Sequence, residues 1–461
     1  MSRKNILFCY CRTPSFTNAV RDYVLAFGDY SEHRIHYYDM DSGPIDFSLD
    51  PFDAIIFNYC FWARRLPLAS YLCNKVANFT GLKIAIFQDE YDYFLWHEKT
   101  VLAFGIDTIV TGVPEMHWPD VYRNKAFRKI TFINALTGYV NDSHLRQSKY
   151  KPLDERQWVL GYRSRVAPFG YGRLTQEKVL IGRKMKELCL DRGIAANIEV
   201  SEESRIYGPA WPEFLGNCRA VLGTESGSNV FDFNGTVKPA IEKFVSENPD
   251  TDFETVSEKF LQGTDGRIRM NQISPRVFET IAMKTGLVLF EGEYSGVVRP
   301  WEHFIPLKKD FSNVDQVLAV LADSRAMNLM IQRAFDDVIA SGAYHFKAYI
   351  KRLDDHVSAN CTMDKRYEPC FGLLGWRCSD ESPISVMPGQ RMQIPMTRPL
   401  RHFDNFHDPV IEIKINRGAL YRTIVKWFNS AVGMRIKKRM QENQRMYLAL
   451  RKAVWWITGK W

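Results

Sequence analysis

Residues 158–192 read WVLGYRSRVAPFGYGRLTQEKVLIGRKMKELCLDR and contain the pattern on which the fold prediction depends. An apolar strand at Trp158–Tyr162 is followed, after a glycine-rich loop, by apolar residues at helical spacing from about Thr175 to Arg192. Strands that alternate with helices form a parallel sheet, with helices on its faces. Ligands of such sheets bind beyond the carboxyl ends of the strands. This stretch therefore predicts an α/β domain with its site at that edge.

The same alternation extends in both directions along the chain. It predicts an α/β fold with two Rossmann-like domains, residues 1–150 and 151–350, of the type that face each other across a cleft. Residues 229–272 look like an insertion in the second domain, with a polar helix of their own over 248–262. The expected strands are Lys4–Cys11, Ala54–Asn58, Lys83–Phe87, Thr108–Thr111, Lys129–Ile133, Trp158–Tyr162, Ile198–Val200, Ala220–Leu222, Leu287–Phe290 and His303–Pro306. The expected helices of the second domain are Thr175–Arg192, Ala210–Asn217, Arg276–Lys284, Val314–Leu321 and Met327–Tyr349.

Composition and cysteine usage indicate a globular protein of a reducing compartment. Apolar residues make up 46% of 461 residues, which is typical of a chain that folds into two or three domains. The nine cysteines include no C-x-x-C pair, and this argues against a zinc cage or a disulfide framework. The sequence shows neither a signal peptide nor a run of 18 apolar residues, so we expect a cytoplasmic protein without a membrane span.

The positive charge of the chain is concentrated in its last residues. The chain carries 61 Lys/Arg and 53 Asp/Glu, of which residues 417–461 hold eleven and one, which leaves 50 bases against 52 acids elsewhere. Residues 417–461 also show helical apolar spacing, so they predict a basic amphipathic tail. Such a tail indicates an anionic membrane surface, at the inner face of the cell membrane, rather than nucleic acid. Residues 351–416 lack periodicity and are expected to form an irregular segment.

The stretch SPRVFETIAMKTG, Ser274–Gly286, is the strongest candidate for an anion site. Ser274 and the following proline suit the start of a helix, on which Arg276 and Glu279 lie one turn apart. A helix start attracts a diphosphate, and a glutamate one turn further can accept two ribose hydroxyls. The alternative is a capped helix with an internal Arg–Glu pair.

The loop GYRSRVAPFGYGRLTQEK, Gly161–Lys178, combines glycines with several bases. Arg163, Arg165 and Lys178 are candidates for binding a pyrophosphate, whose charge a guanidinium fork matches well. The spacing is neither that of a Walker loop nor that of a dinucleotide-binding fingerprint. The alternative is a solvated basic loop.

Carboxylates follow one expected strand in each domain. Glu225 lies in GTESGSNVFDFNG, where glycines allow the backbone to approach a ligand, although such a segment is also ordinary turn chemistry. In the first domain, QDEYD places Asp89 and Glu90 at a strand end, where either could act as general base for an acceptor hydroxyl. His97 and His117 are candidates for the same cleft. Acids at a helix start are equally well explained by the helix dipole.

Taken together, six stretches resemble the group 1 glycosyltransferases of GT-B fold, in a branch from bacterial surface-polysaccharide loci. They are GYRSR, GYGRLTQEK, SRIYGPAW, LGTESGSNVFDFNG, SPRVFE and HFIPLKKDFSN, in this order between Gly161 and Asn313. QDEYD is also similar to that branch. Beyond about residue 354 the chain resembles nothing that we recognise.

The resemblance implies a glycosyltransferase with a nucleotide-sugar donor bound by the second domain. The acceptor is then a lipid-linked or polymeric glycan, as in O-antigen or capsule synthesis, and neither a metal nor another cofactor is expected. Many relatives have two glutamates separated by seven residues, whereas here Asn271 stands at the first position relative to Glu279. Glu225 could take that role, and the departure puts a retaining mechanism in doubt. Alternatives are a nucleotide-sugar epimerase or a polyol-phosphate transferase on this fold, or a non-catalytic membrane-bound scaffold.

Overall fold

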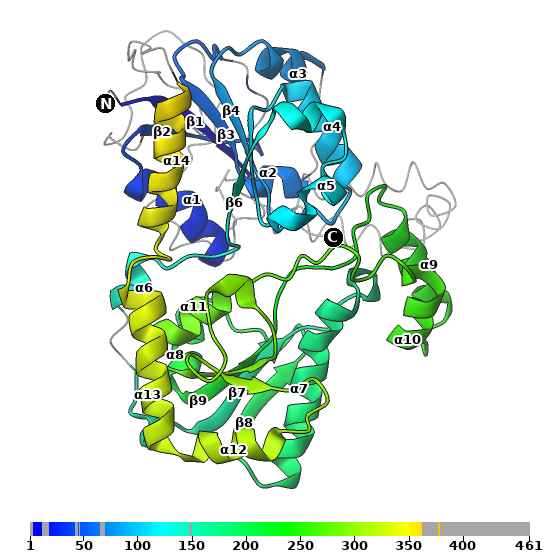
Figure 1. The fold of residues 1–461 in the computed structure, drawn as a ribbon, viewed down its shortest axis with the longest axis vertical. Helices are drawn as coiled ribbons and strands as arrows, with labels where there is room; N and C mark the ends of the chain where they lie inside the picture. The colour runs from blue at the N-terminus through cyan, green and yellow to red at the C-terminus, as the bar shows by residue number, and fades with distance from the viewer. Residues whose placement is uncertain are drawn as a thin grey trace, which may run out of the picture. The chain divides into compact units, whose positions relative to one another are not determined.

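The structure, a computed structural model, describes residues 3–11, 18–41, 45, 47–64, 70–146, 150–361 and 377–378. Within these residues the strands form two separate sheets, each flanked by helices (Figure 1). The predicted α/β class with two Rossmann-like units in series is thereby confirmed. The expected basic tail, 417–461, lies outside the described residues, as do residues 362–376 and 379–416 of the segment expected to be irregular. The first residues of that segment, 351–360, are helical instead, because the last helix, α14, spans Phe346–Asn360.

The first sheet has the strand order β12-β2-β1-β3-β4-β5-β6. Its six strands up to residue 134 are parallel, and all five that the sequence predicted are present. The strands are β1 Asn5–Tyr10, β2 Arg34–Asp39, β3 Ala54–Phe57, β4 Leu82–Ile86, β5 Thr108–Thr111 and β6 Thr131–Asn134. The short β12, Arg377–Cys378, pairs antiparallel with β2 and comes from the segment expected to be irregular. The accompanying helices are α1 Asn18–Tyr30, α2 Tyr59–Arg64, α3 Ser70–Ala77, α4 Phe94–Phe104, α5 Trp118–Val121 and α6 Asp142–Arg146.

The second sheet is parallel throughout and has the order β11-β10-β9-β7-β8. In the sheet, β8 lies on one side of β7, and the next strand along the chain, β9, lies on the other side. The strand order therefore reverses between β7 and β9. In open α/β sheets this switch point is where ligands bind. The strands are β7 Trp158–Ser164, β8 Ala196–Val200, β9 Cys218–Gly223, β10 Gly286–Phe290 and β11 Ile305–Leu307. The helices are α7 Arg173–Asp191, α8 Ala210–Gly216, α11 Pro275–Ala282, α12 Val314–Ala322 and α13 Ser324–Ala334.

The expected single helix Met327–Tyr349 is wrong, because the chain turns before residue 346. After α13 a π-helical stretch, Phe335–Ala340, leads to a turn in which Gly342 has φ +74°. A new helix, α14 Phe346–Asn360, then packs against α1 of the first domain, where the hydroxyl groups of Tyr23 and Tyr349 are hydrogen bonded. The chain therefore returns to the first sheet after it has completed the second.

The insertion 229–272 contains two helices, α9 Val237–Glu247 and α10 Phe253–Val256, which a π-helical turn extends. The expected helix over 248–262 is therefore wrong in its bounds, since α9 ends before residue 248 and Asp252 caps the next helix. The two helices share a small core of their own. The flanking side chains Phe231 and Met270, however, belong to the core of the first domain. The insertion thus packs on the first domain although it interrupts the sequence of the second.

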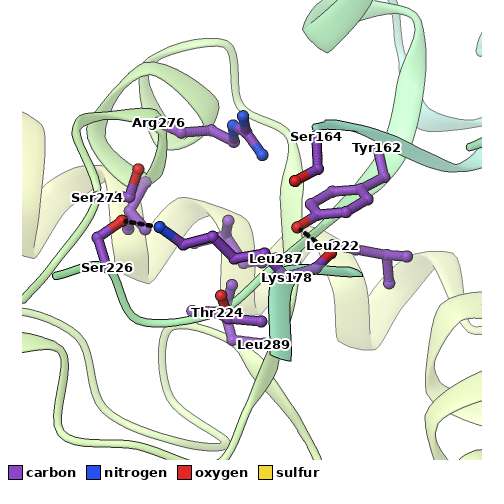
Figure 2. A pocket seen from close by; sticks show the side chains of 12 residues that line it. Tyr162, Ser164, Lys178, Leu222, Thr224, Ser226, Ser274, Arg276, Leu287 and Leu289 are labelled. Carbon is purple, nitrogen blue, oxygen red and sulfur yellow. Dashed lines mark hydrogen bonds between the residues drawn. The ribbon is translucent and has the colours of Figure 1, made fainter. Parts of the chain in front are cut away.

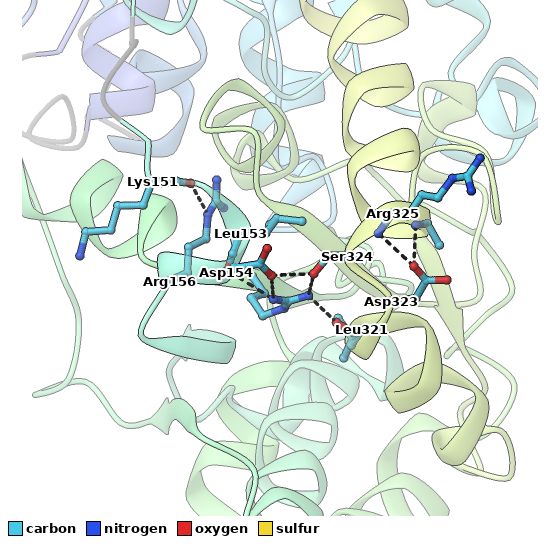
Figure 3. Close-up of polar contacts among 10 residues, drawn as sticks. Lys151, Leu153, Asp154, Arg156, Leu321, Asp323, Ser324 and Arg325 are labelled. Atoms are coloured by element: carbon cyan, nitrogen blue, oxygen red, sulfur yellow. Dashed lines mark hydrogen bonds and ion pairs between the residues drawn. The ribbon is translucent and has the colours of Figure 1, made fainter.

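Two arginines, Arg156 and Arg219, hold the segment 151–156, which leads into the second sheet, in place (Figure 3). The buried guanidinium of Arg156 donates to the carbonyl oxygens of Cys218 and Lys284 at 2.8 and 2.9 Å. Burial lowers the pKa of Arg156 to about 10. Arg219 in turn binds Asp154 at 3.1 Å and thereby holds the same segment against the start of α13. No helix among the described residues is long and apolar enough to cross a membrane.

Candidate functional site

A pocket lies where the switch point of the second sheet predicts a ligand. It encloses about 440 Å³ of empty space, part of it open to solvent. Figure 2 shows side chains from β7, β9, α7 and the start of α11 gathered around it. Of the residues predicted from the sequence, Lys178, Ser274 and Arg276 line this pocket.

Lys178 reaches the pocket from the first turns of α7. Its Nζ donates to Oγ of Ser226 at 3.2 Å, and the hydroxyl of Tyr162 donates to its carbonyl oxygen at 3.0 Å (Figure 2). Burial of the ammonium, and next the positive charge of Arg276, lower the pKa of Lys178 to about 8. The lysine is therefore charged at neutral pH, and a nearby anion would stabilise that charge.

We expect donor affinity to decrease as the pH rises above about 8. Lys178 loses its proton there in the free protein, whereas a bound diphosphate favours the protonated form and raises its pKa. The Kd of a nucleotide sugar should be constant below pH 7 and rise by up to about tenfold per pH unit above 8. Titration calorimetry from pH 6.5 to 9.5 measures this. Lys178→Arg, which stays charged, should remove the pH dependence, and an unchanged dependence in that variant would contradict the assignment.

The start of α11 is open towards the pocket. Pro275 occupies the first turn and has no N–H, and the side chain of Ser274 forms no capping hydrogen bond. The guanidinium carbon of Arg276 lies 5.4 Å from the ring centroids of both Tyr162 and Trp211. The aromatic rings hold this charge beside the helix start, which is an arrangement suited to a phosphate group.

Glu279 lies one turn further along α11. Its Oε2 accepts a hydrogen bond from Nε1 of Trp211 at 2.7 Å, and burial raises the pKa of its carboxyl group. One carboxylate oxygen is therefore held by the indole, and Glu279 is not among the residues that line the pocket. Its role in ribose binding stays a prediction. Trp211 was missed from the sequence, although the stretch SRIYGPAW contained it.

Arg163 does not reach the pocket, which corrects its predicted role. Its guanidinium lies over the Phe214 ring at 4.5 Å and donates to the carbonyl and side-chain oxygens of Asn197 at 2.8 and 2.7 Å. Side chains alternate along a strand, so Tyr162 and Ser164 of β7 face the pocket while Arg163 points away from it. Arg165 follows the strand, is exposed, and lies close enough for its charge to lower the pKa of Lys178.

Glu225 is buried beside the pocket and does not line it, and its predicted catalytic role stays a prediction. Its Oε1 accepts hydrogen bonds from the backbone N–H groups of Glu293 and Tyr294 at 3.1 and 2.9 Å. Glu293 is right-handed and Tyr294 left-handed, with φ −94° and +48°, and this pair forms an anion-binding nest. Its Oε2 accepts from Nδ2 of Asn271 at 2.6 Å. Glu225 is therefore hydrogen bonded to Asn271, which stands at the position of the first glutamate in the family that the chain resembles.

Gly227, two residues after Glu225, is required by the packing of the backbone. Gly227 has φ +97°, and a Cβ atom there would lie 2.0 Å from the carbonyl oxygen of Met270. The close approach is therefore between the insertion and its own entry segment rather than between backbone and ligand.

The two first-domain acids differ in their surroundings. Glu90 is fully buried, its Oε1 accepts from the hydroxyl groups of Thr111 and Tyr122, and burial raises its pKa to about 7. Its carboxyl group is not accessible to an acceptor from solvent in this structure, and its predicted role as a base is not supported by this position. Asp89 is exposed to solvent at its surface and accepts from the Tyr91 hydroxyl at 2.7 Å. Desolvation by the surrounding protein is nevertheless the largest effect on its carboxyl group and raises its pKa, whereas the positive charge of Lys178 lowers it. Neither acid lines the pocket, and of the two only Asp89 is exposed to solvent.

The two histidines considered for this cleft are buried in the first domain. His97 packs against the rings of Trp62 and Phe87, and His117 pairs with Asp120. Within the described ranges no three His, Cys, Asp or Glu side chains gather into a metal site. The expected metal independence stays a prediction.

No protein-family model and no curated protein matches this sequence. Among solved structures, an alpha-glucosyltransferase in complex with UDP-glucose and DNA is similar over 77% of this chain and 100% of that chain, with 10% identity and a TM-score of 0.47. HepE of Anabaena in complex with UDP-glucose is similar over the same shares, with 10% identity and a TM-score of 0.41. TarM is similar over 66% of this chain, which spans about half (54%) of TarM's length, with 10% identity and a TM-score of 0.37. At this identity, what the chain does has to be inferred from its own residues.

Proposed function

We propose that this chain is a glycosyltransferase that moves a sugar from a nucleotide-sugar donor to an acceptor hydroxyl. The observation that carries the proposal is the meeting of Lys178, Arg276 and the open start of α11 at the switch point of the second sheet. Two cationic side chains and a helix start supply the positive charge that a diphosphate needs. Two Rossmann-like units in series are also the arrangement that a GT-B enzyme requires.

The neighbouring residues supply the remaining roles in this proposal. Glu279, oriented by Trp211, accepts ribose hydroxyls, while Lys178 and Arg276 stabilise the diphosphate as it leaves. Asp89 contacts the acceptor and acts as its base if the reaction inverts. We infer that no metal is needed, because these positive groups balance the charge of the leaving diphosphate.

The acceptor is proposed to be a lipid-linked or polymeric glycan of a bacterial surface polysaccharide, such as O-antigen or capsule. The support is the resemblance of the stretches between Gly161 and Asn313 and the basic, aromatic composition of residues 417–461. Tryptophans favour the headgroup level of a membrane, and each base near an anionic surface contributes about 1 kcal/mol. The chain would then work at the inner face of the cell membrane.

Removing residues 417–461 should abolish binding to anionic vesicles and leave transfer to a short, water-soluble acceptor intact. Eleven bases and several indole rings are lost with this segment, while the pocket residues described above are kept. Flotation with phosphatidylglycerol vesicles measures the binding, with neutral vesicles as control. Equal recovery of the full and the shortened chain with anionic vesicles would remove the membrane from the proposal.

A thermal-shift screen with UDP-, GDP-, dTDP-, CDP- and CMP-sugars tests the donor class. We expect one nucleotide to raise the melting temperature of the wild-type chain and not that of Lys178→Met. Lys184→Met on the same helix is the control, because Lys184 is exposed and pairs only with Glu187 among the described residues. If no nucleotide sugar stabilises the chain, a non-catalytic scaffold becomes the better reading. Binding accompanied by a change in the sugar instead of its transfer would favour an epimerase.

A further inference from the structure

Lys238, the second residue of α9, has an unusual place for a lysine. The residue is 7% exposed, and its ammonium lies 3.9 Å from the ring centroid of Tyr171 and 5.0 Å from that of Tyr91. It also forms an ion pair with Asp92. A buried lysine loses favourable hydration, so such a position needs compensation by partners, and here an acid and two aromatic faces provide it.

These contacts join three parts of the chain. Lys238 belongs to the insertion, Tyr91 and Asp92 to the first domain, and Tyr171 to the second domain. The hydroxyl group of Tyr171 donates to Oδ2 of Asp92 at 3.2 Å. The backbone reinforces the junction, because the N–H of Asp232 donates to the carbonyl oxygen of Tyr91 at 2.9 Å. The place of Lys238 is therefore fixed from several sides.

Both partners of Lys238 in the first domain hold Asp89. The Tyr91 hydroxyl donates to Oδ1 of Asp89 at 2.7 Å, and the backbone N–H of Asp92 donates to the carbonyl oxygen of Asp89 at 3.2 Å. Lys238 thus contacts the ring of one residue and the carboxylate of the other, and these two residues bond the side chain and the backbone of the exposed acid. It is also close enough to act on the charge of Asp89 directly.

We propose that Lys238 is a positioning residue that fixes the orientation and the charge of Asp89 through Tyr91 and Asp92. The inference rests on the proposed function, in which Asp89 faces the acceptor. An insertion that appears in the sequence of the donor domain then completes the acceptor side of the site. A purely structural lysine would affect stability and leave the properties of Asp89 unchanged.

Kinetics of Lys238→Met test the proposal against Lys243→Met, an exposed lysine of the same helix. We expect kcat to fall about tenfold in Lys238→Met, since small displacements of a reacting group cost this much or more. Donor Kd should change less than twofold. Lys238→Arg keeps the charge and should restore most of the rate.

The pH profile separates positioning from stability. The titratable groups that interact electrostatically with Asp89 are Lys178, Lys238, Asp92, Glu90 and the hydroxyl groups of Tyr59, Tyr91 and Tyr171. Loss of the positive charge of Lys238 should raise the pKa of Asp89, so the acid limb of kcat/KM should move to higher pH. A limb at the same pH as in Lys243→Met would overturn the proposal.

Two further measurements test the proposal in other ways. The variant Tyr91→Phe serves if Lys238→Met does not fold, and hydrogen exchange serves if the wild-type chain shows no sugar transfer. Tyr91→Phe keeps the ring beside Lys238 and removes only the hydrogen bond to Asp89, so it should lower kcat by itself, and a wild-type rate would overturn the proposal. Amide hydrogen exchange over residues 88–93 needs no activity and should become faster in Lys238→Met. Faster exchange without any transfer by the wild-type chain would contradict the proposed function alone, whereas unchanged exchange would contradict the role of Lys238.

Discussion

Replacing Arg276 by alanine is expected to weaken binding of the nucleotide-sugar donor by about 1.5–3 kcal/mol, which is about 10- to 150-fold in Kd. The side chain lines the pocket and is the positive group nearest to the start of α11. Its loss removes a charge-assisted hydrogen bond to phosphate and lowers the positive potential at the helix start. It also relieves Lys178 of a neighbouring positive charge, so the pKa of Lys178 should rise from about 8.

Titration calorimetry with the matching nucleotide sugar measures this effect. Arg276→Lys should recover part of the affinity, because a lysine supplies the charge without the planar fork. Arg325→Ala, an exposed arginine at the start of α13, is the matched control and should bind as the wild type does. Unchanged affinity in Arg276→Ala would place the diphosphate elsewhere.

Replacing Glu225 by alanine should reduce turnover about 100-fold and change donor affinity only slightly. The carboxylate ends a directional chain of hydrogen bonds. The backbone N–H of Met270 donates to Asn229, Nδ2 of Asn229 donates to Asn271 at 2.9 Å, and Nδ2 of Asn271 donates to Glu225. Because a carboxylate only accepts, it can receive this chain and the N–H groups of the nest at the same time.

The variant Glu225→Gln tests the direction of the chain without a loss of volume. If the side-chain oxygen of the glutamine accepts from Tyr294, its NH₂ group faces the NH₂ group of Asn271. If the side-chain amides of Asn271 and Asn229 both turn over to remove this clash, the NH₂ group of Asn229 then faces the backbone N–H of Met270. One donor–donor contact therefore remains in every arrangement, and an unsatisfied buried donor costs about 1–3 kcal/mol. We expect a kcat about tenfold lower with unchanged donor Kd. A wild-type kcat in both variants would remove Glu225 from the working site.

The fold was largely predictable because its strands are apolar and short. The strand β2 was missed, since His36 and Asp39 interrupt its apolar run although both are buried in the structure. The long helix 327–349 was wrong because a regular apolar spacing continues across the turn at Gly342. Local patterns therefore predicted the elements wherever burial follows hydrophobicity.

The donor side of the site was partly predictable, because Lys178, Ser274 and Arg276 lie at strand and helix ends that meet at one edge of the sheet. Arg163 was expected at the pocket and does not line it, because β7 continues to Ser164 and this places the arginine on the opposite face of the strand. Glu90 turns into the first domain towards Thr111, which no local pattern indicates. The pair of Asp92 and Lys238 joins residues 146 positions apart and is visible only in the folded chain.

The central claim is that a nucleotide sugar binds this pocket and gives up its sugar. The most direct measurement is the release of nucleoside diphosphate, with transfer of a radiolabelled sugar to a membrane-derived glycan acceptor, by the wild type, Lys178→Met with Arg276→Ala, and Lys184→Met. The account predicts acceptor-dependent transfer by the wild type and by Lys184→Met, and loss of at least about 100-fold in kcat/KM in the double variant. Transfer by the double variant at the wild-type rate would contradict it.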